Sequence, residues 1–328
     1  MLRDRRKNIV NTAKIKVYEF EDPINQQIKK LIDLDNWHSL LALLKNYAFI
    51  LASVLITYQT HWYGYPLAVL VIGSRQRALA TLLHEAAHKT LARNRWLNLI
   101  VGSFCSGYLI LQTITAYRQS HVRYHHGHFG DPELDPDYKL MLEEGLYDHP
   151  VKLQSFALKH LLAPLFLSKV PVYLYSLVRH RLWDGGDHLA EKALMLAYVT
   201  SIVAGATFLG LGKVLLLFWV VPYLTTFQII GWFIELNEHF PLMQNDCNLY
   251  MARNRHSHWL ESFFTGMHNE SYHLVHHLNP ALPFWNQVKA HQVYLQDYNY
   301  TQQDTCSGGI FISSNGQPSF VMSLLNLK

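Results

Sequence analysis

Histidine is the residue type whose number and spacing in this sequence most clearly indicate chemistry. The chain has 20 histidines but only 3 cysteines. Eight of the histidines fall into three short groups, which are His84-Glu85-Ala86-Ala87-His88, His121-Val122-Arg123-Tyr124-His125-His126 and His273-Leu274-Val275-His276-His277. Imidazole nitrogens are common ligands of transition metals, so these groups predict a metal centre built on imidazole and not on thiolate.

Each group has the spacing of one helix face. Residues at positions i and i+4 face the same way, with Cβ atoms about 5–6 Å apart, so His84 and His88 can hold one metal ion. In the second group His121 and His125 share a face, and His126 is turned about 100° aside, where it can reach a neighbouring ion. The third group has the spacing i, i+3 and i+4, again on one face. We therefore predict a shared centre.

The overall composition restricts the elements that can hold such a centre. Hydrophobic residues make up 50% of the 328 residues and charged residues 16%, against about 25% charged in soluble proteins. The net charge of +4 comes without a long basic stripe, which argues against nucleic acid as a partner. The three cysteines, Cys105, Cys247 and Cys306, are too widely spaced for a disulfide framework, a cysteine zinc module or an iron–sulfur cluster.

Apolar runs predict an all-α integral membrane protein with about four transmembrane helices in two hairpins. The limbs are residues 40–58 with 67–83 and residues 193–209 with 214–234, each near the roughly 20 residues that span a bilayer. The turn at residues 61–66 carries no acidic or basic side chain, whereas the flanking segments are basic. By the positive-inside bias, we expect both termini and all three histidine groups on the cytoplasmic side, in a helical cap.

The remaining segments complete one domain at residues 40–297. Residues 96–116 are apolar enough either to cross the membrane or only to dip into it, and residues 156–178 suit a helix along the interface. Residues 1–39 form a basic segment without the apolar core of a signal peptide. Residues 298–328 are expected to be an irregular tail.

The three histidine groups resemble the histidine boxes of the membrane fatty acid desaturase and hydroxylase superfamily, in the same order. The segment from His268 to Pro280 and the following Pro283-Phe284-Trp285 are also similar to the extended third box of many members. The resemblance covers roughly residues 40–295. It implies two iron ions that activate O2, four crossing helices under a cytoplasmic cap, and electrons from a separate ferredoxin or cytochrome b5 type donor.

The resemblance also implies a ninth ligand after the last transmembrane limb, where His239 stands. Acyl-CoA desaturases have an asparagine four residues before this histidine, which holds an iron through water. Here that position is Glu235, and Asn237 lies only two residues before His239. The Glu235 carboxylate could bind or bridge iron directly, or it could be an interfacial acid paired with a base.

The expected metal ligands are therefore nine histidines, namely His84, His88, His121, His125, His126, His239, His273, His276 and His277. Three further residues are candidates for an additional ligand or an outer-shell group, namely Glu235, Asn237 and Asp131. Asp131 begins an acidic run, and such acids can orient an imidazole by accepting its second N–H. A solvated loop is an equally good interpretation of that run.

These expectations point to an O2-dependent membrane oxidoreductase that introduces a double bond into a fatty acyl chain of a lipid. Hydroxylation of an acyl chain, a carotenoid or another apolar molecule would use the same site and stays open, because the two outcomes differ only in fine positioning. His84 to His88 also match HExxH, the motif of zinc proteases, which would need only one further ligand. A metal transporter would place its ligands near the membrane midplane, usually in repeated halves, and no repeat is evident.

Overall fold

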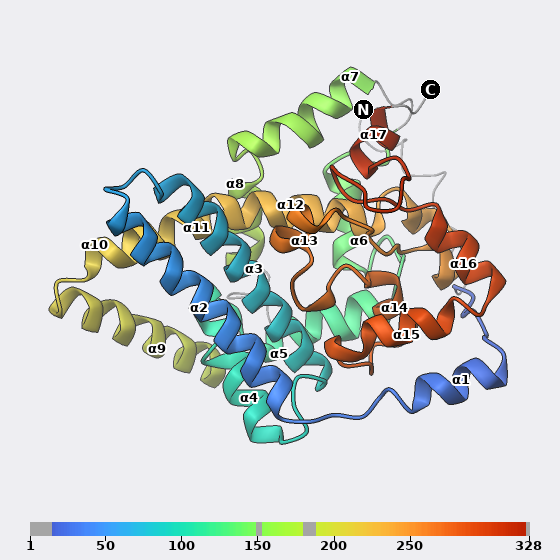
Figure 1. Ribbon diagram of the computed structural model, residues 1–328, viewed down its shortest axis with the longest axis horizontal. Helices are drawn as coiled ribbons and strands as arrows, with labels where there is room; N and C mark the ends of the chain where they lie inside the picture. Colours follow the sequence, from blue (N-terminus) through green and yellow to red (C-terminus); the bar gives the residue numbers. More distant parts are fainter. Residues whose placement is uncertain (1–14, 149–152, 180–187, 326–328) are drawn as a thin grey trace.

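Helices form the larger part of the described residues. The computed structural model describes residues 15–148, 153–179 and 188–325 (Figure 1). Within those ranges, β structure is confined to two isolated bridges, Lys16 with Cys247 and Ser257 with Ser313. The expected all-α class is thus confirmed. The basic residues before position 15 lie outside the described residues and are Arg3, Arg5, Arg6, Lys7 and Lys14.

The first half of the chain holds two long helices and a series of short ones. They are α1 (Asp22–Lys29), α2 (Trp37–Gln59), α3 (Tyr65–His88), α4 (Arg95–Ser103), η1 (Gly107–Ile110), α5 (Ile114–Tyr117), η2 (Arg118–His126), α6 (Pro136–Glu143), α7 (Leu153–Phe156), η3 (Ala157–Leu162), η4 (Ala163–Phe166) and α8 (Val170–Ser176).

The second half adds one long helix, a long broken helical run and a set of short helices, η8 to α17, which we call the cap. They are α9 (Leu189–Phe208), α10 (Gly212–Leu215), η6 (Leu216–Val220), α11 (Val221–Leu224), α12 (Thr226–His239), η7 (Leu242–Gln244), η8 (Asn248–Tyr250), α13 (Trp259–Thr265), η9 (Met267–Asn269), α14 (His273–Leu278), η10 (Phe284–Asn286), α15 (Gln287–Tyr294), α16 (Tyr298–Thr305) and α17 (Phe320–Leu325).

Three helical stretches are long and apolar enough to cross a membrane: α2, α9 and the run Gly212–Gln244. Two pairs qualify only as bent spans, residues 95–110 with 114–126, bent by 86°, and residues 153–166 with 170–179, bent by 74°. In α9 only 11% of the apolar window is buried, so its side chains face outward, as lipid contact requires. The protein is therefore an integral membrane protein with three to five candidate crossings, and the division into two hairpins stays a prediction.

Helix α3, which we expected to be the second limb of the first hairpin, lies inside the protein. It packs against α2, α4 and α12, and its side chains from Val71 to Leu83 are almost all buried. It also carries Arg75 and Arg77, and the guanidinium of Arg75 lies over the Phe263 ring, 4.7 Å from its centroid. Charges inside a protein-covered helix explain why α3 is not among the apolar candidate spans.

A close contact between α3 and α12 aligns the two helices that carry histidines of the site. A Cβ added to Gly73 would lie 2.0 Å from Oγ1 of Thr226, and that hydroxyl donates to the carbonyl of Val69 at 2.6 Å. Only glycine allows the helices to approach this closely. From this contact both helices continue toward the cap, where they end in His88 and His239.

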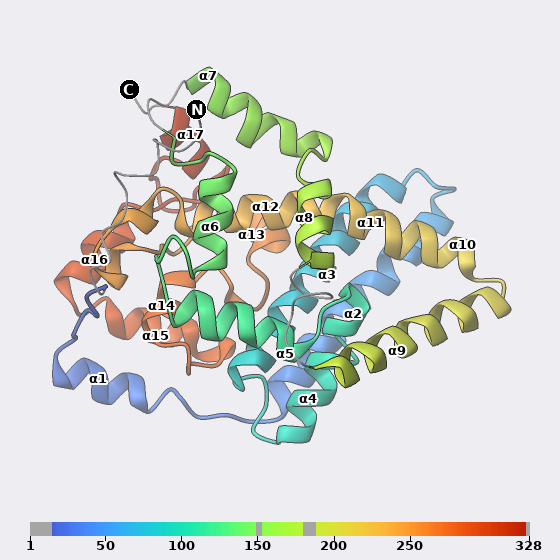
Figure 2. The same ribbon diagram turned by 180° about the vertical axis from the view of Figure 1, so that it is seen from behind.

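The cap lies at the end of the molecule away from α9 and α10 (Figures 1 and 2). Residues after Tyr298, which we expected to be irregular, contain α16 and α17. The segment between these helices is held by Glu261, whose carboxylate accepts hydrogen bonds from the backbone N–H groups of Ile310 (2.7 Å), Phe311 (2.8 Å) and Ile312 (2.7 Å). A buried acceptor distant in sequence therefore orders the tail, which a local pattern cannot indicate.

Candidate metal centre

The nine histidines lie together as two adjoining groups. In the first group, five rings offer nitrogen atoms within 4.8 Å of one another, and they belong to His84, His88, His121, His126 and His276. In the second group, His125, His239 and His277 meet the same criterion. His273 joins the second group, because its Nε2 lies 2.9 Å from Nε2 of His239 and 3.0 Å from Nε2 of His277. Residues separated by almost two hundred positions thus share one buried region.

The second histidine group of the sequence is divided between the two clusters in a way that we did not expect. Residues 118–126 form a π-helix, in which the backbone repeats at i+5. His121 and His126, five residues apart, therefore point together, with 3.1 Å between their Nε2 atoms. His125 instead lies 3.3 Å from His277, between Nε2 atoms. Ligand atoms of His121 and His125 do lie within 4.8 Å of each other, as we expected, together with one of Asp137. The expectation that His126 would be turned away from His121 rested on an α-helix and was wrong.

Helix α14 also divides its histidines. Nε2 of His276 lies 2.9 Å from Nε2 of His126 and 3.0 Å from Nε2 of His84, in the first cluster. His273 and His277, four residues apart, both face the second cluster. One short helix therefore contributes to both clusters and connects them.

Hydrogen-bond partners outside the clusters determine which nitrogen of His125 and His239 faces the second cluster. Nδ1 of His125 lies 2.9 Å from Oδ1 of Asp135, and both side chains are almost fully buried. Nδ1 of His239 lies 3.1 Å from the carbonyl of Met251. Both partners accept only, so when the ring is neutral its proton is on Nδ1 and the Nε2 lone pair points into the cluster, as metal ligation requires.

The charge state of the third histidine group also suits metal binding. Burial, followed by the charges of neighbouring histidines, holds the pKa of His273, His276 and His277 well below 6.5. These rings are therefore neutral near pH 7, which is the form that binds metal. In addition, the buried Nε2 of His88 has no hydrogen-bond partner among the described residues. Converging imidazole nitrogens of this kind fit a transition metal.

The three additional candidates occupy different places. Glu235 belongs to neither histidine cluster but is exposed and lines the adjoining cavity. Asn237 is fully buried, and its side-chain nitrogen and oxygen have no hydrogen-bond partner among the described residues. The carboxylate of Asp131 accepts from the backbone N–H groups of Glu133 and Leu134 within its own turn. The acids that reach a histidine from that run are Asp135 and, at 3.4 Å from His125 Nδ1, Asp137.

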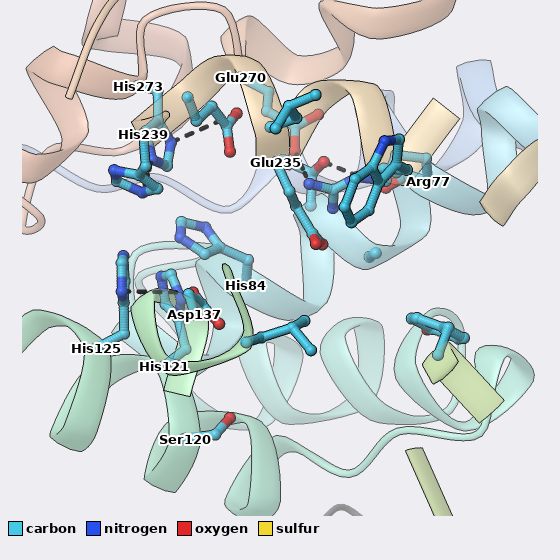
Figure 3. A pocket seen from close by; sticks show the side chains of 18 of the residues that line it. Arg77, His84, Ser120, His121, His125, Asp137, Glu235, His239, Glu270 and His273 are labelled. Carbon is cyan, nitrogen blue, oxygen red and sulfur yellow. Dashed lines mark hydrogen bonds and ion pairs between the residues drawn. The ribbon is translucent and has the colours of Figure 1, made fainter. Parts of the chain in front are cut away.

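A cavity of about 220 Å³ adjoins the histidines (Figure 3). The rings of His84, His121, His125, His239, His273 and His276 form part of its wall. Apolar side chains from several helices, among them Ala80, Val172 and Phe227, form another part. Five further charged side chains line it, namely Arg77, Glu144, Lys169, Glu235 and Glu270, among which Arg77 pairs with Glu270 and Lys169 with Glu144. Sequence reasoning missed this charged lining, although Arg77 within an apolar helix was a signal.

Comparison with known proteins decides the family. The family model described as "Fatty acid desaturase" matches residues 60–305. The chain belongs to the fatty acid desaturase family. This desaturase is 39% identical to the "Dihydrorhizobitoxine desaturase" of Bradyrhizobium elkanii over 325 residues, which are 96% of this chain and 92% of that protein.

Plant relatives of the desaturase are more distant. The chloroplastic "Omega-3 fatty acid desaturase" of Glycine max is 25% identical over 78% of this chain and 60% of its own length. The chloroplastic "sn-2 acyl-lipid omega-3 desaturase (ferredoxin)" of Arabidopsis thaliana is also 25% identical, over 77% of this chain and 60% of its own length. The membership supports a desaturase-type oxidoreductase with a metal cofactor, as the resemblance of the histidine boxes implied.

The acid of the HExxH motif has an orienting position in this desaturase. Oε2 of Glu85 accepts hydrogen bonds from Oγ1 of Thr90 at 2.8 Å and from the backbone N–H of Phe284 at 3.1 Å. Its other oxygen lies 3.4 Å from Nδ1 of His84, on the side of the ring away from the cluster. A protease would need this carboxylate beside a metal-bound water. The contacts instead tie Glu85 to the ring and to neighbouring backbone.

Proposed function

We propose that this chain is an O2-dependent di-iron desaturase, with each cluster of imidazoles binding one iron. The first iron would be held by His84, His88, His121, His126 and His276, and the second by His125, His239, His273 and His277. The observation that carries this proposal is the convergence of imidazole nitrogens into two adjoining clusters. Five and four nitrogen ligands suit iron and leave room for O2.

Iron supplies the redox chemistry, which is the activation of O2 for removal of hydrogen from an unactivated C–H bond. In the overall reaction a CH2–CH2 unit loses two hydrogens, and O2 takes up these with two electrons and two protons to give two waters. The side chains of the desaturase orient the histidine rings and keep bulk water away from them. Asp135 and the carbonyl of Met251 hold the rings of His125 and His239, and burial excludes bulk water from the clusters.

Two substrate classes have support. The omega-3 and omega-6 relatives are named for fatty acids, which agrees with the expectation of a fatty acyl chain of a lipid. The relative with 39% identity is named for dihydrorhizobitoxine, and the match covers nearly all of both chains. That coverage supports a second candidate substrate, a molecule like dihydrorhizobitoxine. In both cases the proposed product is a new carbon–carbon double bond.

The electrons would come from a separate protein. Ferredoxin appears in the name of one relative, and a cytochrome b5 type protein is the other donor class that the family uses. We further propose that the clusters and both termini lie on the cytoplasmic side, in agreement with the basic segments that flank α2 and α3. Residues 40–297 would form the catalytic domain.

Profiling of lipids and water-soluble metabolites tests this proposal in a host that expresses either the wild-type chain or His125→Ala. A compound that gains a double bond only with the wild-type chain would support desaturation. A compound that gains a hydroxyl group instead would show that the site is a hydroxylase. If neither fraction changes while the protein is present in the membrane with iron, the proposed activity is wrong.

A further inference from the structure

One face of α12 forms a long wall of the cavity. Four residues of this helix that line the cavity follow one another at i+4, namely Phe227, Gly231, Glu235 and His239. Residues at this spacing share one face of a helix, and Figure 3 shows the side chains of Glu235 and His239 directed toward the cavity. At a rise of about 1.5 Å per residue, Gly231 stands about 12 Å along the helix from His239, and Phe227 about 6 Å further. The cavity therefore extends along α12 away from the histidine clusters.

Gly231 is the position at which this wall recedes. A Cβ added there would meet no heavy atom of the described residues within 4 Å, apart from the adjoining part of its own helix. Gly73 on α3 is the opposite case, because its added Cβ would lie 2.0 Å from Oγ1 of Thr226. Glycine is unfavourable in a helix interior relative to alanine. Helix packing explains the glycine at 73, whereas the feature that accompanies the glycine at 231 is open space in the cavity.

The end of the cavity beyond Gly231 is largely apolar. Phe227 lies one turn away on the same face, and Ala80 of α3 and Val172 of α8 also line the cavity. Phe227 and Ala80 belong to one buried apolar cluster, against which Tyr173 of α8 packs. Hydrocarbon that leaves water to contact such a surface is stabilised. This end of the cavity is therefore suited to an apolar part of a ligand.

Polar side chains of the same region bond to the protein. Nε2 of Gln228 donates to the carbonyl of Tyr223 at 3.1 Å. Lys169 pairs with Glu144, and its Nζ lies over the Trp232 ring, 4.3 Å from the centroid. The donors of Gln228 and Lys169 thus have protein partners, and contact with a ligand falls mainly to the apolar groups.

From these observations, and resting on the proposed function, we propose that Gly231 limits the size of the substrate by leaving space for its apolar end. The reacting carbon atoms would lie beside the histidine clusters, and the chain beyond them would extend along α12 over Gly231 toward Phe227. A cavity of about 150 Å³ is enough for one benzene molecule, so a cavity of about 220 Å³ accepts a short apolar group. A larger side chain at position 231 would occupy this space.

The response to a larger side chain separates this role from helix packing. Gly231→Leu should fold and retain iron, because the new side chain enters open space and leucine is the better helix residue. Gly73→Leu is the contrasting variant, since its side chain would clash with Thr226 and should lower both the melting temperature and the iron content. A Gly231→Leu protein that loses iron, or melts at a lower temperature than the wild type, would assign this glycine to packing and overturn the inference.

Photo-crosslinking measures the space itself without turnover. The probes are decan-1-ol and butan-1-ol, each with a diazirine on its last carbon, irradiated with the iron-loaded protein in lipid nanodiscs without O2. Mass spectrometry then locates the residues that carry a probe. We expect the decanol probe to label Phe227 and Ala80 in the wild-type chain, and Gly231→Leu to reduce this labelling about tenfold or more. The butanol probe should label the cavity in both chains, because it needs less of its length.

Gly205→Leu is the matched control. Gly205 is an exposed glycine of α9 that does not line the cavity, and its added Cβ would also meet no heavy atom of the described residues within 4 Å. This variant should leave the labelling by both probes unchanged. A loss of labelling in Gly205→Leu equal to that in Gly231→Leu would reject a specific role of the cavity glycine.

Three further results would overturn the inference. They are unchanged decanol labelling in Gly231→Leu, equal loss of both probes in that variant, and absence of labelling inside the cavity of the wild-type chain. None of these results depends on turnover, so each is separate from failure of the proposed desaturation. A wild-type chain that forms a double bond, together with unchanged labelling in Gly231→Leu, would leave the desaturase activity intact and reject the role of Gly231.

Discussion

Asp135 and His125 form a buried pair in which a carboxylate oxygen lies 2.9 Å from Nδ1 of a ring that faces the second cluster. The same Asp135 carboxylate caps α6, because it accepts from the backbone N–H groups of Asp137 and Tyr138. It also accepts from the backbone N–H of Gly130 at 3.0 Å. One side chain thus joins the end of the second histidine group to the next helix and sets the tautomer of a ligand.

Replacement of this carboxylate should weaken metal binding more than folding. Asp135→Asn removes the negative charge beside His125 and turns one of the two acceptors into an N–H group. Because Oδ1 serves both His125 and the helix cap while Oδ2 accepts from Gly130, either orientation of the amide loses one of these contacts. Loss of such an outer partner typically lowers metal affinity by about 10–100-fold. The measurement is iron retained per chain after dialysis against a graded series of chelator concentrations. Asp131→Asn is the matched control, since Asp131 contacts only its own turn, and equal loss in both variants would contradict this role.

Combinations of histidine variants should reveal which rings share an ion. His126→Ala should remove the first iron, and His88→Ala in addition should remove little more, because both rings belong to the first cluster. His126→Ala combined with His239→Ala should remove both irons. Iron content measured by elemental analysis should therefore fall from about two per chain to about one in the first double variant and toward zero in the second. The opposite ranking of the two double variants would refute the assignment of ligands to clusters.

Much of this site is predictable from the sequence, because spacing at i+4 is a property of the helix itself. His84 and His88 meet as that spacing requires. The pairing of His121 with His126 is not predictable in this way, since it depends on a π-helical hydrogen-bond pattern in residues 118–126 that no residue type specifies. The role of Asp135 likewise depends on how the turn after Gly130 folds back toward His125.

The membrane fold was predictable to a similar extent. Apolar length identified α2, α9 and the run Gly212–Gln244. It could not show that α3 would be enclosed by other helices, because burial against protein and burial against lipid favour the same residues. Arg75 and Arg77 are the exception, because charged side chains favour burial against protein and not against lipid. Their protein partners, Phe263 and Glu270, lie almost two hundred residues away in the sequence.

Asn254 should be important for stability, although it contacts no metal ligand side chain. Its Oδ1 accepts from the backbone N–H of Leu274 at 3.1 Å, at the start of α14, and its Nδ2 donates to Tyr300 at 2.8 Å and to Asp304 at 2.7 Å. Asn254→Ala leaves these buried groups without their partner, at about 1–3 kcal/mol for each unsatisfied group.

The melting temperature in detergent checks this expectation. Asn254→Ala should lower it by several degrees, whereas the exposed Asn299→Ala should change it little. Iron retention should fall together with stability, since α14 carries three of the histidines. A stable Asn254→Ala protein with unchanged iron content would contradict the role of Asn254 in positioning α14.

The Asp304 carboxylate predicts how stability changes in acid. Burial raises its pKa, but the hydrogen bond and charge of His256 and the hydrogen bond of Asn254 outweigh burial and hold the pKa below 3.8. A carboxyl group with a depressed pKa in the folded state stabilises that state above its unfolded pKa of about 4, and this stabilisation is lost as the pH falls through the folded value.

Melting temperatures of the wild-type protein and Asp304→Asn between pH 3 and pH 7 measure this contribution. We expect the wild-type protein to be more stable near pH 6, and we expect the difference to shrink once the pH falls below about 4. A difference that stays constant over this range would show that the charge of Asp304 does not contribute to stability.

The most direct test of the central claim is the metal content of the purified, ⁵⁷Fe-loaded protein, determined by elemental analysis together with Mössbauer spectroscopy. The two clusters predict about two irons per chain in nitrogen-rich environments, and loss of one of them in His239→Ala. A single zinc per chain, or iron that is unaffected by His239→Ala, would contradict the di-iron assignment.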